Sequence, residues 1–389
     1  MAAHNARRLA PSAQRRLGLI GSAGLIGLAA IVTTAVIADW QPAAATTSAQ
    51  SHVALQLGAK HPVKIRVTPE PTISATPTST PTPTTSSKPT GVPSTLWVDP
   101  ANPAAAAQQT LRSHGRSADA NQLGKIATRA TAIWLTGSAD AAVAKVKKVV
   151  TAATAAGQLP VFVLYHLPNR DCGGYSSGGA SSAADYRSWI TAVAGAIGAN
   201  YAEVIVEPDA VAMAASRSCA TATASGQSEL VAGAVSSLAR LAHTTVYLDA
   251  GHSAWVSNVA TLANSLRAAG LAQADGFALN VSNFQTLAAS LAYGDKVSAA
   301  TGGKHYVVDT SRNGAGPLPS SSGYAGPSWC NPPGRALGAA PTLHTGHGLA
   351  DAYLWVKYPG ASDGSCGLGD PSAGSFWTDY ALGLAQRSS

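Results

Sequence analysis

Short apolar runs alternate with alanine-rich segments through most of the chain after residue 94. The runs are rich in Val, Ile and Leu, and they cover residues 132–135, 161–164, 204–206, 245–248, 276–279, 305–308 and 352–356. Continuous apolar runs of this length are typical of strands buried on both faces of a parallel sheet. The segments between them read as helices. Repeated about seven times, the alternation predicts an α/β fold, a (β/α) barrel or a close relative of it.

Almost every predicted strand is followed at once by a polar or ionisable residue. Asp209 follows the third run and Asp249 the fourth, and Lys357 follows the last. Side chains just past the carboxyl ends of parallel strands face the crevice in which such folds bind ligands. We therefore expect the chemistry at this end. A doubly wound open sheet is the alternative, but the chain has no Gly-x-Gly-x-x-Gly turn after an early strand and no P-loop.

Two acids stand out within this pattern. Asp171 and Asp209, 38 residues apart, come after the second and third apolar runs, so both could face one substrate. Two carboxylates in one cleft are the minimum requirement for breaking a glycosidic bond. Two neighbouring carboxylates cannot both ionise cheaply, so one of them should keep a proton near neutral pH.

The first 94 residues differ from the rest in composition. Four arginines precede an uncharged, mostly apolar stretch over residues 17–38, which predicts a signal peptide or a membrane anchor in residues 1–40. Val36-Ile-Ala38 would serve as a cleavage site, and we favour cleavage. Residues 41–94 are rich in Thr, Pro and Ser and read as a low-complexity linker. Residues 95–389 form the predicted catalytic domain.

The positive charge of the chain lies mostly outside the predicted domain. The net charge is +7, and the first 94 residues contribute eight Lys and Arg against two acids, which is six of the seven charges. The globular part is therefore nearly neutral. Because a nucleic-acid partner would require a basic face on the folded domain, we expect none.

Four cysteines fall in the predicted domain. An even number in an exported chain suggests disulfides, and three connectivities are open at this point. Metal binding is the alternative, but the chain has no Cys-x-x-Cys and no nearby pair of His at ligand spacing. We expect neither a metal nor an organic cofactor.

Seven short motifs resemble glycoside hydrolase family 6, the inverting cellulases that include endoglucanases and cellobiohydrolases. In chain order they are Tyr165-His-Leu-Pro-Asn-Arg-Asp-Cys-Gly173, Val204-Ile-Val-Glu-Pro-Asp209, Tyr247-Leu-Asp-Ala-Gly-His-Ser-Ala-Trp255, Asn280-Val-Ser-Asn283, Asp309-Thr-Ser-Arg-Asn-Gly314, Trp329-Cys-Asn-Pro-Pro-Gly-Arg335 and Leu354-Trp-Val-Lys357. The resemblance covers Thr95 to the end of the chain. It implies a distorted barrel of about seven parallel strands, in agreement with the count of apolar runs.

The resemblance also implies catalytic roles. Asp209 matches the general acid that protonates the leaving-group oxygen, and Asp171 matches the carboxylate that keeps the pKa of that acid high. An inverting mechanism needs a base that activates water, with about 6.5 to 9.5 Å between the two carboxyl groups. Asp363 matches the family's candidate base. Water relayed to Asp171 is the competing account.

Further matches imply sugar contacts and disulfides. The implied contacts are Tyr165, Trp97, Asp249, His252, Trp255, Asn280, Trp329 and Lys357, and the implied bridges are Cys172 to Cys219 and Cys330 to Cys366. Taken singly, several of these residues have ordinary structural explanations. An acid after a strand can cap the next helix, a lone Trp is more often core packing, and a lysine can simply be solvated.

We expect an endo-1,4-β-glucanase, because only a short stretch follows Asp363 before the terminal helix and the cleft should be open. Ala361 stands where the family usually has Glu, which should weaken binding beside the cleavage point or admit another glycan. Three alternatives stay open: a cellobiohydrolase, a hydrolase of another β-glucan, and a weakly catalytic or non-catalytic glycan-binding protein at the cell surface. We expect a secreted monomer acting on β-1,4-glucan, with the membrane anchor as the alternative form of attachment.

Overall fold

The computed structural model describes residues 91, 93–220, 226–367 and 369–388. The predicted export segment 1–40 lies outside these residues, as does the linker 41–94 apart from 91, 93 and 94. No helix in the described ranges is both long and apolar enough to cross a membrane.

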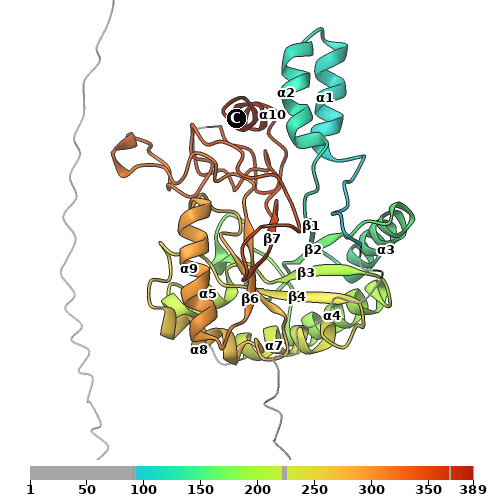
Figure 1. Cartoon of the computed structure of the whole chain (residues 1–389), viewed down its shortest axis with the longest axis vertical. Coiled ribbons are helices and arrows are strands. Elements are labelled where there is room, and N and C mark those ends of the chain that lie inside the picture. The colour runs from blue at the N-terminus through green and yellow to red at the C-terminus, as the bar shows by residue number, and fades with distance from the viewer. Residues whose placement is uncertain (1–90, 92, 221–225, 368, 389) are drawn as a thin grey trace, which may run out of the picture. The chain divides into compact units, whose positions relative to one another are not determined.

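Seven parallel strands form one sheet whose spatial order is the order of the sequence (Figure 1). The strands are β1 Ile133–Leu135, β2 Val161–Leu164, β3 Ala202–Val206, β4 Thr244–Asp249, β5 Gly276–Leu279, β6 His305–Asp309 and β7 Ala350–Leu354. Helices connect them: α3 Ala139–Ala156, α4 Ala183–Ile197, α5 Ala210–Ser216, α7 Gln227–Leu238, α8 Val259–Ala268 and α9 Leu287–Ala300. The predicted α/β fold of seven parallel strands is confirmed.

The sheet curls into a distorted barrel. The side chains of each buried strand point alternately to the two faces of the sheet. Phe162 points outward and packs against the helices, whereas Val163, Ile205 and Val307 point inward and belong to one inner cluster. The edge strands β1 and β7 do not pair as a ladder. The backbone N–H of Ala132 nevertheless donates to the carbonyl oxygen of Trp355 at 2.9 Å. Because β1 and β7 do not pair as strands, the barrel is incomplete and has an open seam between them.

Local sequence explains where the connecting helices begin and end. Ser138 caps the start of α3 with its side-chain oxygen, which accepts from the N–H of Ala141, and Gly157 ends the helix in the left-handed region at φ 63°. Asn258 and Thr286 cap α8 and α9 in the same way. Helices α3, α4, α7, α8 and α9 pack on one another in chain order around the strands, and the short α5 packs against α8 (Figure 1).

Strands β3 and β7 each start two residues earlier than the sequence predicts. The apolar runs indicate residues 204–206 and 352–356, whereas β3 begins at Ala202 and β7 begins at Ala350. Asp351 interrupts the apolar pattern, yet its carboxylate accepts a hydrogen bond of 2.8 Å from the Tyr247 hydroxyl inside the barrel and lies 2.7 Å from Nδ1 of His305. A polar residue with such partners can be accommodated in a strand.

A separate helical layer lies beside the barrel. It consists of α1 Pro103–Ser113, α2 Ser117–Ala127 and α10 Thr378–Gln386, which share one apolar cluster that includes Leu123, Ile126 and Leu384. Two short 3-10 turns, η1 Asp171–Gly173 and η2 Ser320–Ser322, lie in long loops after β2 and β6. Only residues 364–377 separate Asp363 from α10.

Candidate active site

A cleft of about 980 Å³ lies at the carboxyl ends of the strands. Asp171, Asp209 and Asp363 all line it, although they come from the loops after β2, β3 and β7. Five of the predicted sugar contacts line it as well: Tyr165, His252, Trp255, Trp329 and Lys357. The parallel strands thus bring most of the predicted site residues into one cavity.

Asp209 follows the end of β3 by three residues and lies in the left-handed region, at φ 73°. Such a conformation is costly for a residue other than Gly and is found most often at functional sites. Its side chain accepts a hydrogen bond from Tyr165. Burial and then the charge of Asp171 raise the pKa of Asp209 to about 7. Asp209 therefore keeps its proton through the weakly acidic range, as a general acid must.

Asp171 lies in η1, also at positive φ. Its Oδ2 accepts a 2.6 Å hydrogen bond from the backbone N–H of Ser176. Burial raises the pKa of Asp171, while this hydrogen bond and the charge of Arg170 act in the opposite direction. Arg170 also donates to the carbonyl oxygens of Tyr165, at 2.6 Å, and Ser176, at 2.8 Å. Arg170, which was not among the predicted site residues, therefore braces the loop on which Asp171 depends.

Asp363 is held by two cations. Its Oδ2 lies 2.7 Å from Nη1 of Arg312, which is wholly buried, and its Oδ1 lies 3.0 Å from Nζ of Lys357. Burial alone would raise the pKa of Asp363, but the charges of Arg312 and Lys357 outweigh it and hold that pKa below its usual value. The group is thus a carboxylate, the form that a base needs, although neutralisation by two cations weakens its basicity.

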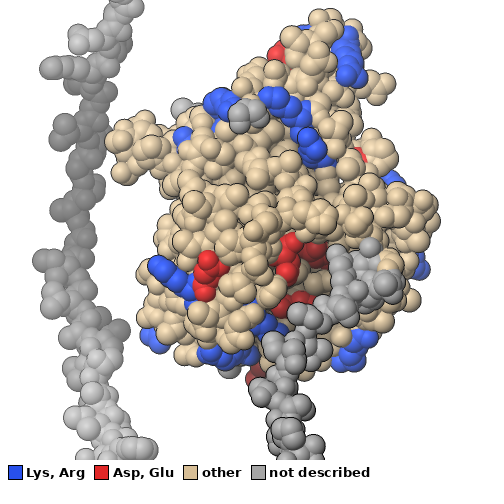
Figure 2. Space-filling model, in the orientation of Figure 1, with Lys and Arg blue, Asp and Glu red and all other residues tan. Residues whose placement is uncertain are grey.

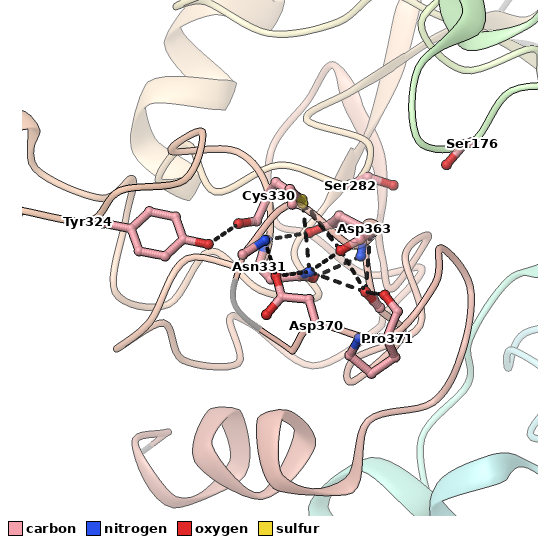
Figure 3. Close-up of a disulfide and its surroundings, with 12 residues drawn as sticks. Ser176, Ser282, Tyr324, Cys330, Asn331, Asp363, Asp370 and Pro371 are labelled. Carbon is pink, nitrogen blue, oxygen red and sulfur yellow. Dashed lines mark hydrogen bonds between the residues drawn. A yellow bond between two sulfur atoms is a disulfide. The ribbon is translucent and has the colours of Figure 1, made fainter. Parts of the chain in front are cut away.

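Asn331 fixes the backbone around Asp363 (Figure 3). Its N–H donates to Oδ2 of Asp363 at 3.0 Å, and its side-chain oxygen accepts from the N–H of Asp363 at 2.8 Å. The side-chain nitrogen donates to Gly364 and Asp370. Neighbouring Cys330 is bonded to Cys366, so the disulfide and Asn331 together brace the loop of Asp363.

The two disulfides pair as the resemblance implied. Cys172 bonds to Cys219, across 47 residues, and joins the loop after β2 to the segment after α5. Cys330 bonds to Cys366. None of the four is a free thiol. Each bridge ties down a loop that carries an acid of the cleft.

Two large aromatic side chains stand half-exposed at the rim. Tyr175 and Trp329 are 49% and 46% exposed, line the cleft, and have ring centroids 6.1 Å apart. Trp329 was among the predicted site residues, whereas Tyr175 was not. The signal was available, since Tyr175 is the one aromatic in a Gly- and Ser-rich loop that begins at Asp171.

Three predicted sugar contacts are not among the described residues that line the cleft. Trp97 is 7% exposed and packs in the core. Asp249 is 1% exposed, and its Oδ2 accepts from the N–H groups of Asp209 and Gly251. Asn280 is wholly buried and bonds to the backbone of Asp309 and Gln285. For Asp249 and Asn280 we therefore replace sugar binding with backbone support, and for Trp97 with core packing.

The other predicted polar contacts do face the cavity. His252 is largely buried, and this burial lowers its pKa to about 4, so the ring is neutral at physiological pH. Its ring centroid lies 5.9 Å from that of Trp255. Among the described residues, no group of three or more His, Cys, Asp or Glu side chains is arranged to hold a metal ion. The chemistry of this part of the site is that of carboxylates, a neutral imidazole and aromatic faces.

Residues 92–388 match the family described as Glycosyl hydrolases family 6. The chain belongs to this family. The resemblance seen in the seven motifs is thereby confirmed, and it extends over the whole described domain.

Named members of family 6 are similar over the same region. Endoglucanase A of Cellulomonas fimi is 44% identical over 301 residues, which is 76% of this chain and 62% of that protein. Endoglucanase 1 of Streptomyces halstedii is 41% identical over 74% of this chain and 87% of that protein. The chain thus spans about three fifths of the length of Endoglucanase A.

A solved family 6 structure has the same fold. The endoglucanase Cel6 from Mycobacterium tuberculosis, in complex with methyl-cellobiosyl-4-deoxy-4-thio-β-D-cellobioside, is 44% identical, with a TM-score of 0.69. The match covers 75% of this chain and 97% of that one. The incomplete barrel of seven parallel strands is thus shared with this member of family 6.

Proposed function

We propose that this protein is an endo-1,4-β-glucanase that hydrolyses internal bonds of β-1,4-glucan with inversion, with Asp209 as the general acid. One observation carries the proposal. Asp209 lies in a long cleft beside a second carboxylate, Asp171, and its pKa is raised to about 7. A carboxyl group that stays protonated next to an ionised partner is the arrangement that acid-assisted cleavage of a glycosidic bond requires.

The shape and lining of the cleft support a polymeric sugar as substrate. Trp255, Trp329 and Tyr175 offer aromatic faces, which suit the apolar faces of pyranose rings, and His252 and Lys357 offer hydrogen bonds. Basic residues form no continuous surface on the face drawn in Figure 2, where they lie in small separate groups among uncharged residues. That distribution favours a neutral glycan over nucleic acid.

The test compares the full chain, produced with its disulfides intact, with Asp209→Asn. Viscosity and reducing ends are followed together on carboxymethylcellulose. We expect a steep loss of viscosity in the wild type and a loss of at least about 100-fold in rate in the variant, since general acid catalysis contributes roughly that factor. A folded wild-type protein that releases no reducing ends from any β-1,4-glucan would contradict the proposal.

One contact favours attack at chain ends as a second candidate. Tyr175 packs closely on Gly364 and near Trp329, so it joins the loop of Asp171 to the loops around Asp363. Such a connection would hinder entry of a chain interior. Release of reducing sugar with little loss of viscosity would support this candidate.

We further propose that the protein works outside the cell as a monomer, exported through residues 1–40. Two disulfides in the domain support an oxidising compartment. Fractionation of producing cells tests this: protein in the medium that lacks residues 1–38 supports cleavage, and full-length protein in the membrane fraction supports an anchor. Retention in the cytoplasm would contradict both, and gel filtration gives the oligomeric state.

A further inference from the structure

Glu207 is a buried acid that the proposed reaction does not use. It lies two residues before Asp209, is 1% exposed, and lines no part of the main cleft. Its carboxylate instead accepts hydrogen bonds from the backbone N–H groups of His166, at 3.0 and 3.1 Å, and Leu167, at 3.0 Å. These two N–H groups belong to the loop after β2, whereas Glu207 follows β3.

The same arrangement recurs at two other strands. At the end of β4, Oδ2 of Asp249 accepts a 2.8 Å bond from the N–H of Asp209, in the loop after β3. At the end of β6, Oδ2 of Asp309 accepts from the N–H of Ser282, after β5, at 2.9 Å and from the N–H of Lys357, after β7, at 3.0 Å. In each case a buried acid holds the loop of a neighbouring strand, and that loop contributes side chains to the cleft.

Burial of such an acid is costly unless its hydrogen bonds are worth the desolvation. Burial raises the pKa of Glu207 to about 7, against the opposing effects of the two backbone N–H groups, the Tyr186 hydroxyl and the charge of Arg170. The residue is also held at positive φ, 47°. Burial of the carboxyl group and the positive φ both cost free energy of folding, which indicates that Glu207 has a role.

We propose that Glu207 is a positioning residue: by holding the backbone of His166 and Leu167, it fixes the loop that carries Asp171 against the strand that carries Asp209. This inference rests on the proposed function, because it concerns the pair of acids assigned to that reaction. The connection is short, since Asp171 is only four residues beyond Leu167. Displacement of the loop by about 1 Å can cost roughly 100-fold in rate.

The pair of acids supplies a readout specific to positioning. The charges that act on Asp209 are those of Asp171, Lys357 and Asp363, and its ionisation is linked to that of Asp249. If the loop relaxes and Asp171 moves away, the pKa of Asp209 falls. Because the general acid must be protonated, the alkaline limb of the rate profile then moves to lower pH.

The experiment uses the full chain with oxidised disulfides and a soluble β-1,4-glucan. For Glu207→Ala we expect kcat to fall about 100-fold, with the alkaline limb displaced downward by about 0.5 to 1 pH unit. KM should change less than about threefold, because Glu207 lines no part of the main cleft. Glu207→Gln keeps an oxygen where Oε2 accepts both N–H groups, and it should recover most of kcat and the wild-type limb.

Asp275→Ala is the matched control. The Oδ2 of Asp275 accepts from the N–H of Val246 at 2.8 Å, at the opposite end of β4 and β5 from the cleft. The Asp275→Ala variant therefore loses a hydrogen bond between a carboxylate and a backbone N–H, as Glu207→Ala does, but at a position away from the cleft. We expect lower thermal stability with an unchanged kcat and an unchanged pH profile.

A folded Glu207→Ala protein whose alkaline limb coincides with that of the wild type would overturn the proposal, whether or not kcat is reduced. If Glu207→Ala does not fold, Glu207→Asp, which withdraws the carboxylate by one methylene, gives the same test with the same two outcomes. A wild-type protein inactive on every β-1,4-glucan would instead overturn the proposed function. Normal wild-type activity with unaltered variants would overturn this inference alone.

Discussion

The backbone N–H of Asp209 donates a 2.8 Å hydrogen bond to Oδ2 of Asp249, an acid buried at the end of the adjacent strand. The same oxygen lies 3.3 Å from the N–H of Gly251. The hydrogen bond to Asp249 thus holds the main chain of Asp209, the proposed general acid, against the end of β4, while the Asp209 side chain reaches the cleft.

Removal of this support should impair catalysis more than binding. Asp249→Ala leaves the N–H of Asp209 without its acceptor, and the left-handed backbone at φ 73° loses its anchor. We expect kcat to fall at least about tenfold and KM to stay nearly constant. Steady-state kinetics on soluble glucan check this, and a rise in KM at constant kcat would show that Asp249 binds sugar after all.

The alkaline limb of activity should report the charge of Asp171. This charge is the largest cause, after burial, of the raised pKa of Asp209, which is about 7. Asp171→Asn removes a negative neighbour, so the carboxylate form of Asp209 becomes easier to reach and its pKa falls. The residual activity of the variant should decline at lower pH than that of the wild type. Coincident limbs would mean that Asp171 does not act on the acid.

The ion pair between Asp363 and Arg312 should matter strongly to stability. Arg312 is wholly buried and the Asp363 side chain is 6% exposed, so Asp363→Asn leaves an uncompensated buried cation. We expect a loss of about 3 kcal/mol or more in the free energy of unfolding by denaturant. The exposed pair of Arg116 and Asp119 is the control, and Asp119→Asn should cost less than about 1 kcal/mol. Equal losses in both variants would refute this.

Thermal stability should be greatest in mildly acidic solution. Burial raises the pKa of Asp209 and of Glu207 to about 7 and that of Asp249 to about 8, whereas unfolded acids titrate near 4. The folded state therefore retains protons that the unfolded state releases, and stability falls as pH rises from about 4 to 8. Asp363 has a lowered pKa in the fold, so its contribution is lost as pH falls below about 4. Tm measured from pH 3 to 8 should peak near pH 4, and Asp249→Asn should flatten the decline toward pH 8.

Tyr175 should limit the entry of chain interiors. Tyr175→Ala removes the side chain that contacts Gly364 and lies near Trp329, and it also removes an aromatic face. We expect more viscosity lost per reducing end released, with KM raised a few-fold. Trp329→Ala should raise KM without changing that ratio. An unchanged ratio in Tyr175→Ala would show that the contact opens freely.

The sequence predicted the strands well because parallel strands buried on both faces must be continuously apolar, as Val161–Leu164 is. It predicted less well what the polar residues after the strands do. A carboxylate that faces the cleft, such as Asp171, and one that turns back to hold backbone, such as Asp249, follow their strands in the same pattern. Side-chain direction decides between them, and it depends on backbone conformations that spacing does not reveal.

The matching order of strands in space and in sequence has a consequence for how such a cleft can change over generations. Each loop borders, along the cleft, the loops that precede and follow it in the gene. An insertion or deletion in one loop thus remodels a single stretch of the cleft, while the remaining stretches keep their neighbours. The shape of the cleft can accordingly change one segment at a time, through local changes in single loops.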